Sequence, residues 1–304
     1  MKNNNIIKVS ELTKKFGNFT AVDHITFDVK EGEIFGFLGA NGAGKTTAMQ
    51  MLIGLSKQSS GEAIVAGYNI RNESEKIKKN IGYMSQRFSL YEDLKVWENI
   101  RLFAGIYGMK DKEIAEKTDE LLDRLDFESE RNTLVKSLPL GWKQKLDFSV
   151  AIFHNPKIVF LDEPTGGVDP ATRRQFWEMI YQAAKDNITV FATTHYMDEA
   201  EYCDRVSIMV DGRIDALDTP TNLKAKYEAS DMDEVFRKTC TKSRKRLKNE
   251  YNYETIHCFC KERVLSYITR QKNHAYPFGY AHCSDVYLWI CHQHGSSKHP
   301  HCHI

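Results

Sequence analysis

Gly39-Ala40-Asn41-Gly42-Ala43-Gly44-Lys45-Thr46-Thr47 is the stretch of this sequence that decides the fold. It fits the pattern Gly-x-x-x-x-Gly-Lys-Ser/Thr, which is typical of phosphate-binding loops. An apolar run over 34–38 precedes the loop and a helix-prone run over 47–53 follows it, in the order that this motif requires. Such a loop points several backbone N–H groups, and the positive end of a helix, at one anion. We therefore expect a strand, a phosphate-binding loop and a helix here.

The loop predicts two particular side-chain roles. Lys45 is expected to reach the β- and γ-phosphates of a nucleotide, and the Thr46 hydroxyl is expected to hold Mg²⁺. A glycine turn without a ligand is the structural alternative, and the ordered strand, loop, lysine and helix count against it. The predicted phosphate-binding residues are Gly39, Asn41, Gly42, Ala43, Gly44, Lys45, Thr46 and Thr47.

The composition bounds the class of protein. The chain has 304 residues, of which 41% are hydrophobic and 27% charged, which suits a soluble globular protein of one large or two small domains. Its net charge of +1 gives no electrostatic reason to expect a nucleic-acid partner. No apolar run is long enough to span a membrane, so we expect any membrane role to depend on a partner.

The hydrophobic pattern predicts an α/β fold. Strands are expected over 6–12, 21–29, 34–38, 61–67, 157–161 and 188–193. Residues 171–185 and most of 90–155 have helical spacing, so the latter region is expected to be a helical insertion. Alternating strands and helices indicate a mostly parallel sheet.

Polar residues follow two of the expected strands. Asp162 and Glu163 end the apolar run 158–161, where Asp162 can orient Mg²⁺ and Glu163 can polarise an attacking water. His195 follows the run 188–193, at the strand end where ligands bind in open α/β sheets, and we interpret it as a donor to the γ-phosphate. Gln86 is a candidate ligand for the metal and the attacking water. A purely structural pair of acids at a strand end is the alternative, which the phosphate loop disfavours.

Taken together, these residues resemble the ATP-binding-cassette (ABC) ATPases over about 6–227. The resemblance implies a P-loop NTPase with a mostly parallel core sheet, an antiparallel β subdomain and a helical subdomain at about 90–155, all within residues 1–235. It further implies that ATP and Mg²⁺ are the cofactors, with Thr46, Gln86 and Asp162 around the metal. Phe16 is similar to the aromatic residue that stacks on adenine, although Phe19 is a rival. Residues 166–169 match the D-loop and His195 the switch histidine.

The sequence around 16–39 and 91–99 looks like that of the drug- and polysaccharide-export branch of this family. The resemblance implies an ATPase subunit that works with integral membrane permease subunits and a second ABC ATPase, at the cytoplasmic face of the bacterial inner membrane. Closure of a cassette dimer on ATP and its reopening on hydrolysis would move the permease. Two alternatives are a soluble ABC-type ATPase acting on ribosomes or DNA, and a non-catalytic ATP-binding regulatory subunit.

One segment departs from the family pattern. The family's Leu-Ser-Gly-Gly-Gln signature stands here as Leu138-Pro139-Leu140-Gly141-Trp142. Pro139 has neither a hydroxyl nor a backbone N–H with which to bind the γ-phosphate held by an opposite subunit. The departure puts a symmetric homodimer with two equal sites in doubt, while this chain's own ATP can still meet a partner's signature.

The chain changes character near residue 236. All cysteines but Cys203 lie beyond that residue, and eight of the eleven histidines lie beyond 256. Their spacings do not match a paired zinc site. When the sequence from Tyr253 onward is back-translated with permissible codons and read one base later, one choice of codons encodes a start methionine, a basic amphipathic segment and an apolar run. The product resembles the N-terminus of a permease. We therefore expect 236–304 to be an atypical tail, out of frame and disordered if a frameshift produced it, and resequencing codons 230–260 decides this.

Overall fold

The computed structural model describes residues 5–86 and 89–250, with side chains to residue 243. Contacts divide the chain into two units, Met1–Arg244 and Lys245–Ile304, and both sheets lie in the first unit. The cysteine- and histidine-rich sequence over 251–304, with its zinc and frameshift hypotheses, lies outside the described residues.

A six-stranded sheet forms the centre of this unit, in the order β10-β9-β3-β8-β7-β6. Every neighbouring pair is parallel except β9 and β10, so the expected mostly parallel sheet is confirmed. The strands are β3 (Ile34–Gly39), β6 (Ile81–Met84), β7 (Ile158–Asp162), β8 (Thr189–Thr194), β9 (Arg205–Val210) and β10 (Arg213–Asp218).

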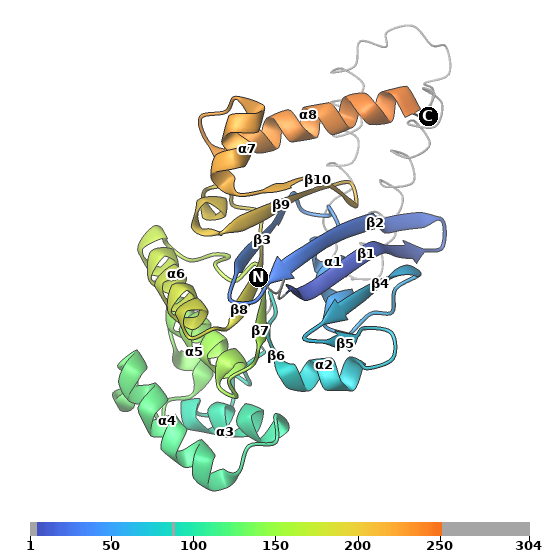
Figure 1. Ribbon diagram of the computed structural model, residues 1–304. Helices are drawn as coiled ribbons and strands as arrows, with labels where there is room; N and C mark the ends of the chain where they lie inside the picture. The colour runs from blue at the N-terminus through green and yellow to red at the C-terminus, as the bar shows by residue number, and fades with distance from the viewer. Residues whose placement is uncertain (1–4, 87–88, 251–304) are drawn as a thin grey trace, which may run out of the picture. The chain divides into compact units, whose positions relative to one another are not determined.

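Both faces of this sheet are buried, because successive side chains along a strand point to opposite faces. In β3, Phe35 and Phe37 enter one hydrophobic core, while Ile34 and Leu38 enter another. Figure 1 shows the second, antiparallel sheet on one side of the parallel sheet and helices α5 (Leu140–Ile152) and α6 (Pro170–Lys185) on the other. Strands with two buried faces read as continuous apolar runs, which explains why β3, β7 and β8 are visible in the sequence.

The antiparallel sheet has the order β2-β1-β4-β5. It confirms the β subdomain implied by the family resemblance, and its inner face shares a core with helix α1 (Lys45–Leu52). Helix α2 (Ser74–Asn80) follows it. The strands are β1 (Asn5–Phe16), β2 (Phe19–Lys30), β4 (Ser60–Val65) and β5 (Tyr68–Asn69).

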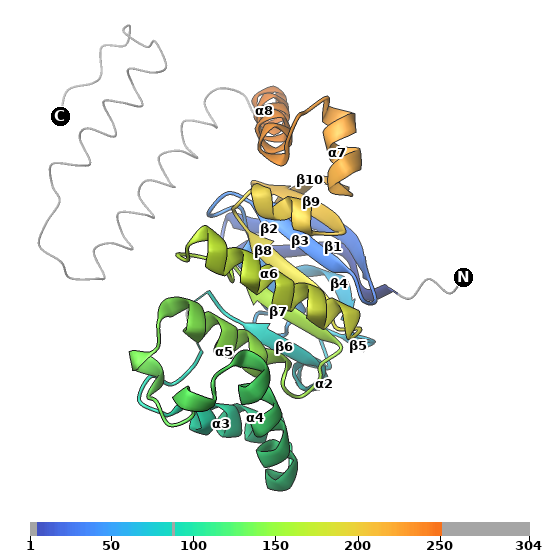
Figure 2. The same cartoon turned by 90° about the vertical axis from the view of Figure 1, so that its left-hand side faces the viewer.

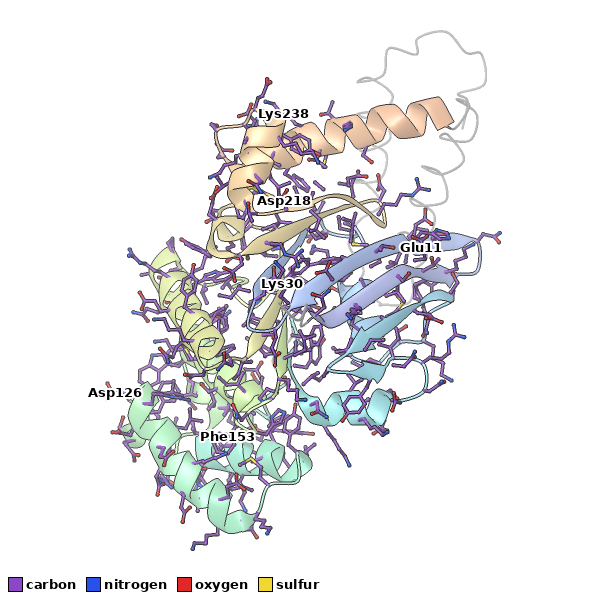
Figure 3. The ribbon with its side chains drawn as sticks, viewed as in Figure 1. Glu11, Lys30, Asp126, Phe153, Asp218 and Lys238 are labelled. Carbon is purple, nitrogen blue, oxygen red and sulfur yellow. The ribbon has the colours of Figure 1, made fainter. Side chains whose placement is uncertain are left out.

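The region expected to be a helical insertion contains α3 (Val96–Ile106), α4 (Asp111–Leu125) and α5, with short 3₁₀ turns η1 (Glu128–Glu130) and η2 (Val135–Ser137). Figure 2 shows α3 and α4 below the strands of the parallel sheet. These helices enclose a core of their own, to which Phe153 at the end of α5 contributes (Figure 3).

The described chain ends in η3 (Asp198–Tyr202), α7 (Pro220–Tyr227) and α8 (Met232–Glu250). Helix α8 crosses residue 236, so residues 236–250, which the sequence assigned to the tail, continue a helix. Its buried stripe is Met232, Val235, Thr239 and Ser243, at three- and four-residue spacing. Beyond residue 236 the stripe consists of small polar residues, so hydrophobic periodicity did not reveal that part of the helix. Lys238, labelled in Figure 3, donates to two carbonyl oxygens at the end of α7.

Candidate nucleotide site

The phosphate-binding loop lies between β3 and α1. Gly42 and Gly44 have φ angles of +81° and +104°, which L side chains rarely adopt. Gly39 has no room for a side chain, since an added Cβ would lie 2.6 Å from the carbonyl oxygen of Met209 on β9. The loop is also tied to the strands beside it, because the Gly212 N–H donates to the carbonyl oxygen of Ala43. The glycines therefore allow a tight loop held against the sheet, with its N–H groups at the start of α1.

Lys45 is the buried cation of this loop. Its ammonium donates to the carbonyl oxygens of Gly39 at 2.8 Å and Ala40 at 3.3 Å. It also lies 3.3 Å from Glu163 Oε1, and the Lys45 side chain is only 4% exposed. The lysine thus folds back over its own loop and holds a fixed positive charge beside the loop carbonyls and Glu163.

Asp162 and Thr46 bring two oxygen ligands together. Thr46 Oγ1 lies 3.3 Å from Asp162 Oδ1, to which Thr193 also donates at 2.6 Å. Burial raises the pKa of Asp162 and the charge of Glu163 adds to this, whereas the bonds from Thr193 and Thr46 and the charge of Lys45 oppose it. A buried carboxylate beside a hydroxyl is a hard oxygen donor set, which fits Mg²⁺.

Glu163 is the point at which the predicted residues meet. Gln86 Nε2 donates to Glu163 Oε2 at 2.9 Å, and His195 Nδ1 lies 3.1 Å from the same oxygen. With Lys45 at the other oxygen, three residues distant in sequence surround one carboxylate. Gln86 bonds to Glu163, and no hydrogen bond joins it to Asp162 or Thr46 among the described residues. Its role as a metal ligand therefore stays a prediction.

The backbone of Glu163 is held in an unusual conformation. Its φ is +51°, in the left-handed region that costs a residue other than glycine about 1–3 kcal/mol. Its N–H donates to both the carbonyl oxygen and the hydroxyl of Thr193, at 3.1 and 3.0 Å. These bonds turn the carboxylate away from the strand direction and toward Lys45 and His195.

Thr193 is a site residue that the sequence analysis missed. It lies opposite Asp162 in the parallel register of β7 and β8. Its hydroxyl donates to the Asp162 carboxylate and accepts from the backbone N–H of Glu163. A threonine at the end of an apolar strand was the available signal, but its partner strand could not be known without the register.

Phe16 and Phe19 face solvent at the turn between β1 and β2. They are paired in the hairpin and are 55% and 41% exposed. The Lys14 ammonium lies 4.9 Å from the centroid of the Phe16 ring. Both rings are free to stack on a base, and no contact of either ring decides between them.

The signature segment begins helix α5. Pro139 is the N-cap residue, without a side-chain bond to the helix, and Leu140 after it is 42% exposed. The next glycine packs on α6, since a Cβ added to Gly141 would lie 2.6 Å from Thr172 Cγ2. The start of α5 is therefore fixed to the D-loop side of its own chain, with Leu140 at the surface.

Two further features bear on the predictions from sequence. No helix among residues 5–86 and 89–250 is long and apolar enough to cross a membrane. In the same part of the chain, no three His, Cys, Asp or Glu side chains gather as a metal site.

Known proteins resemble this chain in sequence and in fold. Residues 22–166 match the family model described as ABC transporter. The chain is 47% identical over 220 residues to the probable multidrug ABC transporter ATP-binding protein YbhF of Escherichia coli (strain K12), covering 72% of this chain and 38% of YbhF. It is 35% identical over 219 residues to the linearmycin resistance ATP-binding protein LnrL of Bacillus subtilis (strain 168), covering 72% of this chain and 70% of LnrL. A solved ATP-binding subunit of an ABC transporter is similar with a TM-score of 0.70 and 26% identity, covering 77% of this chain and 99% of that one.

Proposed function

The chain belongs to the ABC transporter family of ATP-binding proteins, and we propose that it binds and hydrolyses MgATP as the ATPase subunit of a membrane export transporter. The single observation that carries the proposal is the convergence of Lys45, Gln86 and His195 on the Glu163 carboxylate, beside Asp162. This is the set of groups that phosphoryl transfer to water requires: a phosphate-binding cation, a base and a polar donor.

Binding and chemistry divide among these residues. The N–H groups at the start of α1 and the Lys45 ammonium bind the β- and γ-phosphates. Thr46 and Asp162, with Gln86, would hold Mg²⁺, which supplies positive charge to the phosphate oxygens. Glu163 orients and polarises the attacking water, and His195 donates to the γ-phosphate. The Glu163 carboxylate is held by its three neighbours, so ATP must rearrange these contacts before water can be activated.

The proposed partners are integral membrane permease subunits at the cytoplasmic face of a bacterial inner membrane. The names of YbhF and LnrL associate relatives with multidrug transport and antibiotic resistance, which supports an export role. On this chain the segment 91–99 and helix α3 present exposed apolar side chains, with Tyr91 57% and Ile106 66% exposed. We propose that this surface receives the permease, so that movement of the helical subdomain is transmitted to the membrane.

A second ABC ATPase is the other proposed partner. Since Pro139 lacks the donors of the signature serine, we propose that the catalytic site of this chain closes against a partner cassette whose signature is complete. The chain spans 38% of the length of YbhF, so the arrangement of cassettes in the whole assembly is part of the proposal.

Two rival functions make different predictions. A soluble ABC ATPase would act on ribosomes or DNA without a membrane protein, and a regulatory subunit would bind ATP without hydrolysis. The buried, strained Glu163 with its three contacts favours a catalytic subunit over a regulatory one, because a site that only binds nucleotide does not need a positioned base.

The test uses the tagged full chain expressed with candidate permease genes in bacteria. Co-purification with an integral membrane protein, together with MgATP-dependent phosphate release that Glu163→Gln abolishes, is the expected result. Sedimentation with ribosomes and absence from the membrane fraction would support the first rival. ATP binding without turnover in the assembled transporter would support the second.

A further inference from the structure

Glu199 is a buried acid that the proposed catalytic groups do not include. It lies in the 3₁₀ turn η3, four residues after His195, and it is 0% exposed. A carboxylate taken out of water destabilises a protein unless hydrogen bonds and a counter-charge compensate for the lost hydration. The partners of Glu199 therefore indicate which segments its carboxylate holds together.

Two segments of the site, the turn after β7 and the end of β8, bond to this one carboxylate. The Thr165 hydroxyl donates to Glu199 Oε1, and the Thr194 hydroxyl donates to Glu199 Oε2 at 2.6 Å. Thr165 leads into the D-loop at 166–169, and Thr194 comes directly before His195. Each carboxylate oxygen of Glu199 thus accepts from one of these two segments. Each bond joins a neutral hydroxyl donor to a carboxylate acceptor, which is the stronger class of hydrogen bond.

Arg173 on α6 supplies the counter-charge. Its Nε lies 3.5 Å from Glu199 Oε1, an ion-pair separation longer than a hydrogen bond. The same guanidinium lies 4.1 Å from the centroid of the Tyr196 ring, on the residue after His195. The Tyr196 N–H in turn donates to Thr194 Oγ1 at 3.0 Å. The residues on both sides of His195 are therefore fixed to the Glu199 cluster.

The D-loop end of the cluster continues to the signature helix. Gln144 Nε2 on α5 donates to the carbonyl oxygen of Gly166 at 3.3 Å, the residue after Thr165. Gly141 packs against Thr172 on α6. A continuous set of contacts thus runs from the start of α5 through the D-loop to Glu199 and on to His195.

We propose that Glu199 is a positioning residue that couples the D-loop to His195, so that displacement at the signature helix is transmitted to the γ-phosphate donor of the same chain. The inference rests on the proposed ATPase function. It gives the two nucleotide sites of a cassette pair a physical connection, because the signature that one chain presents to its partner is linked to that chain's own switch histidine.

The test measures hydrogen–deuterium exchange of the purified full chain. Thr165→Val removes the hydroxyl and nearly keeps the volume, on the D-loop side only. If Glu199 couples the loops, exchange of the backbone amides at 194–198 rises about tenfold or more, although Thr165 is not in that segment. Thr165→Ser, which keeps the hydroxyl, restores slow exchange. Protection that stays unchanged at 194–198 in Thr165→Val would overturn the coupling.

Glu199→Gln and Glu33→Gln form a matched pair of variants. Glu33 is also buried and ion-paired, with Arg205, at a place that contacts none of the catalytic groups. Glu199→Gln is expected to raise exchange in both loop segments and to lower the turnover number about tenfold or more in the assembled transporter, with less than about threefold change in ATP affinity. Equal effects from Glu33→Gln at the same loss of melting temperature would reduce Glu199 to a stabilising role.

The proposed function has its own readout in the same samples. Binding of a fluorescent ATP analogue by the parent chain, and its loss in Lys45→Ala, tests the nucleotide site and is independent of the exchange result. A chain that binds no ATP but shows the exchange coupling would contradict the function alone. A chain that binds ATP without the coupling would contradict the inference alone.

Discussion

The Lys45 ammonium and the Glu163 carboxylate, which come from the helix after β3 and from the end of β7, are 3.3 Å apart and both largely buried. Each therefore compensates the charge of the other. Under the proposed function, ATP would offer Lys45 a more highly charged partner, and the carboxylate would then lose its counter-charge at the moment when a base is required. Substitution of either residue is therefore expected to leave the other without its counter-charge.

Lys45→Ala is expected to lower MgATP affinity by at least about tenfold, because it deletes the fixed cation at the phosphates and the charge-assisted bonds that it makes. Isothermal titration of the purified full chain measures this. The variant is also expected to melt earlier, since Glu163 is left buried with an unpaired charge. Unchanged affinity for ATP would refute the role assigned to the loop.

Glu163→Gln should abolish turnover while ATP binding is kept. The amide preserves size and shape but cannot polarise water as the carboxylate does. Because the variant frees Lys45 from its ion pair, we expect the affinity for ATP to equal or exceed that of the parent chain. Phosphate release in the assembled transporter is the measurement, and a rate near that of the parent would show that another group is the base.

Phe16→Ala is expected to weaken ATP binding by about 1–3 kcal/mol, the usual contribution of a base stacked on an aromatic ring. Phe19→Ala is the matched control, since Phe19 is exposed on the same hairpin. Inorganic triphosphate lacks a base, so its affinity should not change in either variant. The opposite ranking of the two variants would assign the stacking role to Phe19.

Pro139→Ser combined with Leu140→Gly should increase ATP-dependent homodimerisation in the Glu163→Gln background, because it restores the donors of the family signature. Pro139 has φ −57° and ψ 152°, a conformation open to serine at an N-cap. Gain of a capping bond and loss of proline rigidity are each about 0.5–1 kcal/mol, so the serine itself should leave stability almost unchanged. Analytical ultracentrifugation with and without MgATP gives the result. If the fraction of dimer does not increase, the altered signature is not the reason why this chain would need a different cassette as its partner.

The buried Asp147 and the half-buried His154 are expected to give opposite pH dependence. Burial lowers the pKa of His154 to about 4, so the stability it contributes is complete above its ordinary 6.5 and is lost as the pH falls toward 4. Burial raises the pKa of Asp147 to about 6, so its ionisation destabilises the fold above that pH, and stability is regained on acidification toward its ordinary 3.8.

Denaturant unfolding at pH about 7.5 and about 5 separates the two. His154→Phe keeps a ring that can stack on Tyr107 and should remove about 2 kcal/mol of the loss on acidification. Asp147→Asn keeps an acceptor for the Ser89 hydroxyl and should increase the net loss by about 1 kcal/mol. Equal pH dependence in the two variants would mean that neither group titrates as its burial requires.

The sequence predicted the fold class and the strands that carry the candidate site. The phosphate loop, Asp162, Glu163 and His195 could be proposed because each follows an apolar strand, and the structure brings them together, while their roles stay predictions. Strand β6 is only four residues long, and β9 and β10 are joined by a tight turn, so their patterns did not separate from the surrounding sequence.

Contacts that depend on strand register could not be predicted from the sequence. Thr193 reaches the Asp162 carboxylate and the backbone N–H of Glu163 only because β7 and β8 are parallel and in the register that pairs it with Asp162. The cluster around Glu199 joins three segments that no local pattern connects. The part of helix α8 beyond residue 236 escaped notice because its buried residues there are Thr239 and Ser243, which hydrophobic periodicity does not count.

The position of β3 in its sheet has a consequence for synthesis of the chain. β3 ends at Gly39, but its neighbours are β8, which begins at Thr189, and β9, which begins at Arg205. At ribosomal rates of about 5–20 residues per second, the strand that carries the phosphate loop waits roughly 8–30 s for its first hydrogen-bonding partner. During that interval its apolar residues must be shielded by α1, the antiparallel sheet or a chaperone. A translation product that stops before β9 therefore contains the whole phosphate-binding motif and still lacks the completed sheet that gives the motif its shape.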